Sequence, residues 1–220
     1  FMNTQITAIS PIDGRYFNKT RPLSKILSEY GLIYYRVYVE IHFLITLSKE
    51  PALTECEALS EADASFLSHL LINFNEASAL RVKEIEKVTN HDVKAVEYFL
   101  KEQFKASPSL EKLSEFIHFG LTSEDVNNLA YALMLKNCQE NVMLPQSQDV
   151  IDTLSEMAKK HIDITMLSRT HGQAASPTTM GKELSNVVAR LKQVQCTLKK
   201  QVFLGKCNGA VGNFNALDFA

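Results

Sequence analysis

The sequence predicts an all-α protein, and three observations lead to this fold class. Apolar residues recur at intervals of three and four positions along nearly the whole chain of 220 residues. The alternation of apolar and polar residues that marks strands is not sustained anywhere. Helix-start signals, in which a Ser or Thr precedes acidic residues, stand before several of the periodic segments. We therefore expect helices joined by polar loops.

Two helices are expected in the first third of the chain. The first runs from Leu23 to Leu47, an apolar segment rich in aromatic residues, and is ended by Pro51. The second begins at Ser60-Glu-Ala-Asp63, because a Ser followed three residues later by an acidic residue fits a capping box. Its apolar pattern continues towards Lys87.

A third helix and a short fourth one follow. Asn90 is a good N-cap for a helix over residues 91–105, which stops at Ser107-Pro108 because proline disfavours helix in the residue before it. A short helix over residues 110–119 is then expected to end at Gly120, since glycine readily adopts the left-handed conformation after a helix.

Two long helices are expected in the second half of the chain. Thr122-Ser-Glu-Asp125 is again a capping box, and its helix runs to about His161 with a kink at Pro145. Residues 162–176 are expected to be irregular. Ser176-Pro177 supplies an N-cap and a proline at the first position of a helix of about 28 residues. Its apolar stripe consists of Met180, Leu184, Val187, Val188, Leu191, Val194, Leu198 and Val202. A helix this long is typical of a bundle.

Composition excludes several classes of function. The net charge of −2 gives no sign of nucleic-acid binding. No segment has 18 uninterrupted apolar residues, because the best candidate, residues 31–47, contains Arg36, Glu40 and His42. The N-terminal residues lack the basic and apolar regions of a signal peptide. The four cysteines form no C-x-x-C pair, which favours reduced thiols in the cytoplasm over a disulfide or metal site.

Four polar clusters are candidates for a functional site, and two of them lie before the middle of the chain. In Asp13-Gly-Arg-Tyr16, Arg15 offers a planar fork suited to phosphate and Tyr16 a hydroxyl, but on its own this cluster favours a surface turn. Thr89-Asn-His-Asp92 collects a hydroxyl, an amide, an imidazole and a carboxylate at a helix start, where backbone N–H groups can bind an anion. Plain helix capping is the competing interpretation.

The other two clusters follow in the second half. In His118-Phe-Gly-Leu-Thr-Ser123 the two hydroxyls could cap a helix or bind an anion, and His118 is either a core histidine or a site residue. Ser168-Arg-Thr-His-Gly-Gln173 combines a cation, a hydroxyl, an imidazole and an amide between two long helices. His171 can exchange a proton near neutral pH, so this loop favours function over a structural turn.

These clusters, in this order, resemble the fumarase/aspartase superfamily. Leu121-Thr-Ser-Glu-Asp-Val-Asn-Asn128 is similar to the first signature of that superfamily, and the segment from Ser168 to Gly181 is similar to the second. Within the superfamily, the sequence most resembles the adenylosuccinate lyase family, and this resemblance lies in residues 10–16, 89–100 and 205–213. The resemblance implies a helical N-terminal domain, residues 1–109, and the first part of a central bundle of long helices, residues 110–220.

The resemblance also implies an activity and roles for single residues. The expected reaction eliminates fumarate from adenylosuccinate to give AMP, and from SAICAR to give AICAR, with no metal or organic cofactor. His171 would protonate the leaving nitrogen, with Thr170 beside it. The residues expected to bind substrate are Arg15, Tyr16, Asn90, His91, Asp92, Thr122 and Ser123, with His118 and Gln173 as further candidates. Family members are homotetramers with each site built from three subunits, so the expected partners are nucleotide substrates and further copies of the chain.

One family signature has no counterpart in the sequence. The third signature, a flexible loop that carries a serine base, would lie beyond Ala220, so we expect the 220-residue chain alone to be inactive. Two alternatives stay open. One is a sister lyase of the superfamily, such as argininosuccinate lyase or carboxymuconate cycloisomerase, against which the D-G-R-Y and T-N-H-D segments argue. The other is a helical assembly module without catalysis.

Overall fold

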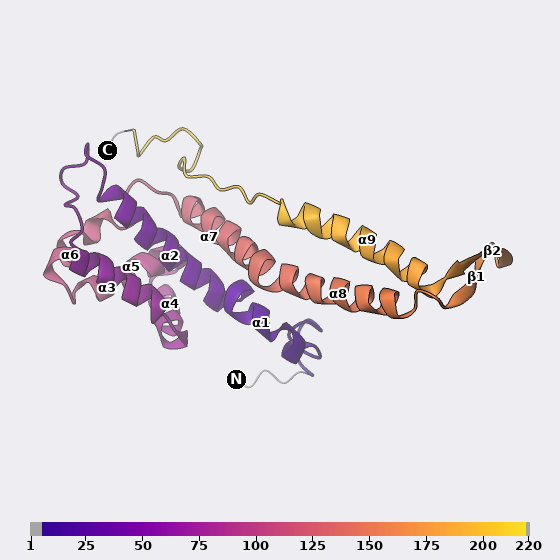
Figure 1. Cartoon of the computed structure of the whole chain (residues 1–220). Helices are drawn as coiled ribbons and strands as arrows, with labels where there is room; N and C mark the ends of the chain where they lie inside the picture. Colours follow the sequence, from indigo (N-terminus) through magenta and orange to yellow (C-terminus); the bar gives the residue numbers. More distant parts are fainter. Residues whose placement is uncertain (1–5, 219–220) are drawn as a thin grey trace. The chain divides into compact units, whose positions relative to one another are not determined.

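The computed structural model describes residues 6–218 and is built mainly from α-helices, which confirms the predicted fold class (Figure 1). The chain forms two compact units. Unit 1 contains the residues up to Leu135 together with the segment from Phe203 onwards, and unit 2 contains Lys136–Val202. The predicted boundary between two domains at residues 109–110 stays a prediction.

The elements of unit 1 follow one another with short connections. In chain order they are α1 (Phe17–Leu27), α2 (Glu29–Leu47), α3 (Glu61–Ile72), α4 (Glu76–Thr89), α5 (Asp92–Phe104), α6 (Pro108–Lys112), the 3-10 helix η1 (Ser114–Phe116) and α7 (Ser123–Cys138), whose last residues belong to unit 2. Their core centres on α2 and α5, where Ile41, Leu100 and Phe104 are fully buried.

The predicted single helix over residues 23–47 is wrong, because the helix is interrupted at Ser28. Ser28 is extended, and its hydroxyl accepts a hydrogen bond from Gly31 N, so α2 starts anew there. The preceding 11 residues form a separate helix, α1, which begins at Phe17. Ser28-Glu29 is itself a helix-start signal, but the continuous apolar pattern around it concealed this.

The capping box at Ser60 is confirmed. Asp63 N donates to Ser60 Oγ over 3.1 Å, and Ser60 N donates to Asp63 Oδ2 over 3.3 Å. The helix it opens ends at Ile72, however, and does not continue towards Lys87. Asn75 caps a separate helix by accepting from two backbone N–H groups, so the predicted second helix is two helices.

The prediction that Asn90 caps the next helix is also wrong. Asn90 ends α4 in the left-handed conformation, with φ +52°, which asparagine tolerates better than most residues. The N-cap of α5 is His91, whose Nδ1 accepts from Lys94 N over 3.1 Å. Further on, the single helix predicted over residues 110–119 is instead split between α6 and η1, while Gly120 adopts the left-handed φ of +70° expected at its end.

Unit 2 is a helical hairpin that carries a small β-hairpin (Figure 1). Its elements are the π-helix η2 (Gln139–Met143), α8 (Leu144–Lys160), β1 (Thr165–Thr170), β2 (Gln173–Thr179) and α9 (Met180–Lys199). The predicted disturbance at Pro145 takes the form of the π turn just before it. A proline ring crowds the carbonyl four residues back, here Asn141, and the wider π turn accommodates it.

The segment predicted as irregular, residues 162–176, is largely β-hairpin. Strands β1 and β2 pair antiparallel, with Thr170 opposite Gln173. The connecting residues His171 and Gly172 have φ +51° and +74°, the signs required by a type I′ turn. Pro177 lies in β2 and does not start a helix. The N-cap of α9 is Thr179, so α9 is shorter than predicted, with 20 residues. Among the described residues, no helix is long and apolar enough to span a membrane.

Candidate active site

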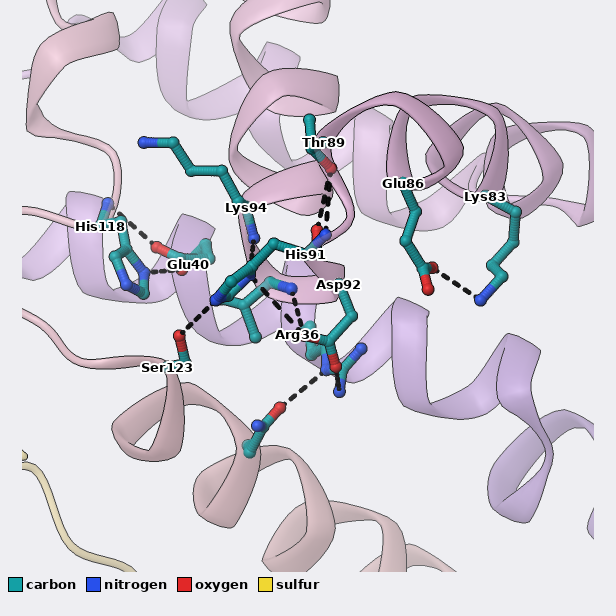
Figure 2. A network of polar contacts seen from close by, with 12 residues as sticks. Arg36, Glu40, Lys83, Glu86, Thr89, His91, Asp92, Lys94, His118 and Ser123 are labelled. Carbon is teal, nitrogen blue, oxygen red and sulfur yellow. Dashed lines mark hydrogen bonds and ion pairs between the residues drawn. The ribbon is translucent and has the colours of Figure 1, made fainter.

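The polar centre of unit 1 is a buried arginine that ties three helices together (Figure 2). Arg36 lies in the middle of α2, and its side chain is only 5% exposed. Its Nη2 donates to Asp92 Oδ2 at the start of α5 over 2.5 Å, and its Nε donates to Asn127 Oδ1 of α7 over 2.8 Å. Burial raises the pKa of the Asp92 carboxyl, but the hydrogen bond from Val93 N and the charge of Arg36 outweigh burial and lower it overall.

His91 stands beside this centre and faces the start of α7. Because Nδ1 accepts the hydrogen bond from Lys94 N, the proton of the neutral ring is assigned to Nε2. Nε2 lies 3.5 Å from Ser123 Oγ (Figure 2). The helix cap therefore orients the imidazole so that its N–H is offered to the Ser123 side of the site. Two predicted site residues, 32 positions apart in sequence, are brought together in this way.

A second buried charge lies close by in α2. The Glu40 side chain is fully buried, and its Oε1 lies 2.6 Å from His118 Nδ1, while Oε2 accepts from His118 N over 3.1 Å. Burial lowers the pKa of His118, but the hydrogen bond and charge of Glu40 outweigh burial and raise it overall. His118 also has φ +62°. His118 is thus an imidazole held by a buried carboxylate, and its role as a site residue stays a prediction.

This pair predicts a pH dependence of stability. Because the pKa of His118 in the folded state is above the ordinary value of 6.5, the stabilisation is complete below pH 6.5 and is lost as the pH rises through the raised pKa. Glu40→Gln should lower the free energy of unfolding by about 1–3 kcal/mol at the acidic end. The difference in Tm between wild type and variant should shrink at alkaline pH. Parallel Tm curves over the whole pH range would contradict the ion pair.

Arg15 and Tyr16 lie ahead of α1 in unit 1. The Arg15 guanidinium carbon rests 5.6 Å from the centre of the Tyr16 ring, and both side chains are exposed. Among the described residues, neither forms a hydrogen bond or ion pair with the network around Arg36. Asn90 is exposed at the end of α4. Their predicted roles in substrate binding stay predictions.

The candidate residues are divided between the two units. His91, Asp92, Thr122 and Ser123 belong to unit 1, whereas Thr170, His171 and Gln173 belong to unit 2. There His171 occupies the turn of the β-hairpin, with Thr170 and Gln173 paired at its base, and all three residues are exposed. Each unit therefore presents its own part of the predicted site.

Sequence reasoning missed Arg36, Glu40 and Asn127 as parts of the site. Arg36 and Glu40 were noticed only as charges that exclude a membrane span. They lie four residues apart in a mostly apolar helix, so they share one helix face and need partners where that face is buried. That spacing was the available signal. Asn127 gave none, because its partner lies 91 positions away.

The sequence is similar to a known protein family and to curated relatives from several bacteria. The sequence matches the family described as Lyase over residues 14–220. It is 52% identical over 211 residues to the adenylosuccinate lyase of Vibrio cholerae, covering 96% of this chain and 46% of the relative. It is 48% identical over 213 residues to the adenylosuccinate lyase of Escherichia coli K12, covering 97% of this chain and 47% of the relative. The chain thus spans about half the length of these curated relatives.

Solved structures show the same fold at low sequence identity. A fumarate lyase from Mesorhizobium sp. BNC1 superposes with a TM-score of 0.69 and 19% identity, over 90% of this chain and 44% of that one. A 3-carboxy-cis,cis-muconate lactonizing enzyme from Pseudomonas putida gives a TM-score of 0.67 and 19% identity, over 90% of this chain and 42% of that one.

Proposed function

Since the chain belongs to the lyase family that it matches over residues 14–220, we propose that it forms part of an adenylosuccinate lyase. The full-length protein would release fumarate from adenylosuccinate to give AMP and from SAICAR to give AICAR. The observation that carries this proposal is the identity of about half of all residues to relatives of that name, along almost the whole chain. The predicted polar clusters lie within the matched length.

The proposed chemistry divides the work between the units. His171 would protonate the nitrogen that leaves as fumarate forms, with Thr170 and Gln173 beside it on the hairpin. His91, with its proton on Nε2, would donate a hydrogen bond to substrate next to Thr122 and Ser123. Asn90 and Asp92 would line the same pocket, and Arg15 and Tyr16 would hold the nucleotide phosphate. Elimination needs no metal or organic cofactor in this scheme.

We also propose a homotetramer whose subunits complete one another's sites. Unit 2 supports this, because α8 and α9 leave several large apolar side chains exposed, among them Val150, Met157, Val187 and Val194. Such exposed apolar surface commonly marks a protein–protein interface. A cytoplasmic location is proposed as well, and it is supported by four free cysteines.

The proposal is tested by fumarate release from the full-length protein. Adenylosuccinate and SAICAR should both yield fumarate, whereas argininosuccinate and carboxymuconate should not react. Turnover of either of the last two instead would identify a sister lyase. Binding of AMP, AICAR and fumarate should raise Tm. A protein that turns over none of the four and is stabilised by none of these ligands would be an assembly module.

Arg15→Lys in the full-length protein should weaken nucleotide binding by about 1–3 kcal/mol, because lysine keeps the charge but loses the planar fork that grips a phosphate. The expected result is a higher KM for adenylosuccinate and weaker inhibition by AMP, with kcat less affected. Exposed Arg21 on α1 provides a matched control, and Arg21→Lys should change neither constant. If the two variants behave alike, Arg15 belongs to a surface turn.

A further inference from the structure

A fully buried carboxylate lies at the start of α7 and has no solvent-exposed surface. Asp125 occupies the first turn of the helix, three residues after Thr122, and its side chain is 0% exposed. A carboxylate has about four acceptor positions. At Asp125 four donors use them: Thr122 N and Gly209 N bind Oδ2, and Lys206 Nζ and Asn208 N bind Oδ1. Asp125 therefore has neither the exposure nor a free acceptor position to bind a ligand.

Three of these four donors come from one distant segment, residues 206–209. Asn128, one helical turn after Asp125, holds the same segment through its side-chain amide, which donates to Lys206 O over 2.9 Å and accepts from Lys206 N over 2.7 Å. Leu129 completes this helix face. A Cβ on Gly205 would lie 2.4 Å from Leu129 Cδ2, so any larger residue there would require the Leu129 side chain to move.

The charge of Asp125 is balanced by one cation. Lys206 Nζ lies 2.8 Å from Asp125 Oδ1 and also donates to Gly209 O over 2.8 Å. Burial raises the pKa of Asp125, but the hydrogen bonds from Lys206 and from the three backbone N–H groups outweigh burial and lower it overall. The aspartate is thus held as a carboxylate, and its partner Lys206 also binds the backbone of Gly209 within the same segment.

The two segments joined by these hydrogen bonds, the start of α7 and residues 206–209, lie beside a common pocket. A cavity of about 220 Å³ is bordered on one side by Gly120 and Thr122 and on the other by Asn208, Gly209 and Asn213. We propose that Asp125 and Lys206 are a positioning pair that fixes residues 206–209 against Thr122 and thereby shapes this wall of the substrate pocket. This inference rests on the proposed lyase function. It gives a role to residues 205–213, which the resemblance singled out without assigning one.

The experiment compares two lysines in the full-length protein. Lys206→Met removes the cation from the pair, and Lys83→Met is the matched control. Lys83 has nearly the same exposure, 38% against 35%, and ion-pairs with Glu86 on α4 over 2.6 Å. We expect Lys206→Met to raise the KM for adenylosuccinate about tenfold or more, and Lys83→Met to leave KM within about twofold of wild type. Lys206→Arg should restore most of the affinity, because it restores the charge.

The outcomes separate the two proposals. An active wild type whose KM and kcat are unchanged in Lys206→Met, with only Tm lowered, would overturn the positioning pair and leave the proposed function intact. A wild type that releases no fumarate would overturn the proposed function and this inference with it. Asp125→Asn supplies a second variant, because its NH₂ group would face hydrogen-bond donors. Asp125→Asn should also raise the KM for adenylosuccinate.

Discussion

His171→Ala in the full-length protein should lower kcat for adenylosuccinate by about 10²–10⁴, the usual contribution of a positioned general acid. The substitution should leave stability nearly unchanged, because the side chain is exposed at a hairpin turn and packs against no core. His171 has φ +51°, a conformation in which residues other than glycine are uncommon. The two-residue hairpin turn requires a positive φ at this position, so this conformation is part of the turn.

Two further variants make this test specific. His171→Asn keeps a residue that tolerates positive φ but removes the titratable ring, so it should lose as much kcat as His171→Ala. His91→Ala should disturb KM as well as kcat, because His91 would position substrate. A lowered Tm with near-normal kcat in His171→Ala would end its assignment as the acid. The proton donor would then have to be sought at His91 or His118.

The sequence predicted the presence of helices well but their ends and connections poorly. Apolar periodicity reports which faces are buried, and it continued across Ser28 and across the break before Asn75, so separate helices looked like one. At Asn90 two rules competed. Asparagine caps a helix start, but it also tolerates the left-handed conformation at a helix end, and here the second role prevailed.

The β-hairpin shows a different limit. Strands β1 and β2 are mostly exposed, so no buried face imposed an alternating pattern on their sequence. The usable signal was a two-residue turn ending in Gly172, flanked by Thr170 and Gln173. The site had the same difficulty. His91 and Ser123 could be named as candidates from their clusters, but the pairing of Arg36 with Asp92 and of Glu40 with His118 required three-dimensional contacts.

Asp92→Ala should destabilise the protein by about 2–3 kcal/mol, because it leaves the guanidinium of Arg36 buried without its counterion. Breaking a fully buried pair costs roughly 3–5 kcal/mol, and we expect less here since Asp92 itself is 43% exposed, so water can reach the gap. Denaturant unfolding measures the change. If Asp92 served only to contact substrate, the variant would show a higher KM with an unchanged free energy of unfolding.

A double variant separates the ion pair from other effects of the substitution. Arg36→Met in the Asp92→Ala background removes the unpaired charge and fills its place with an apolar side chain, which often costs little. Asp92→Ala with Arg36→Met should therefore be more stable than Asp92→Ala alone, a strongly non-additive result of the kind expected for residues in direct contact. Additive losses from the two substitutions would contradict the pairing. The double variant could also regain stability while its KM for adenylosuccinate stays high. Packing would then hold the start of α5 without the ion pair, and the raised KM would show that Asp92 also orients its neighbour His91 or the substrate.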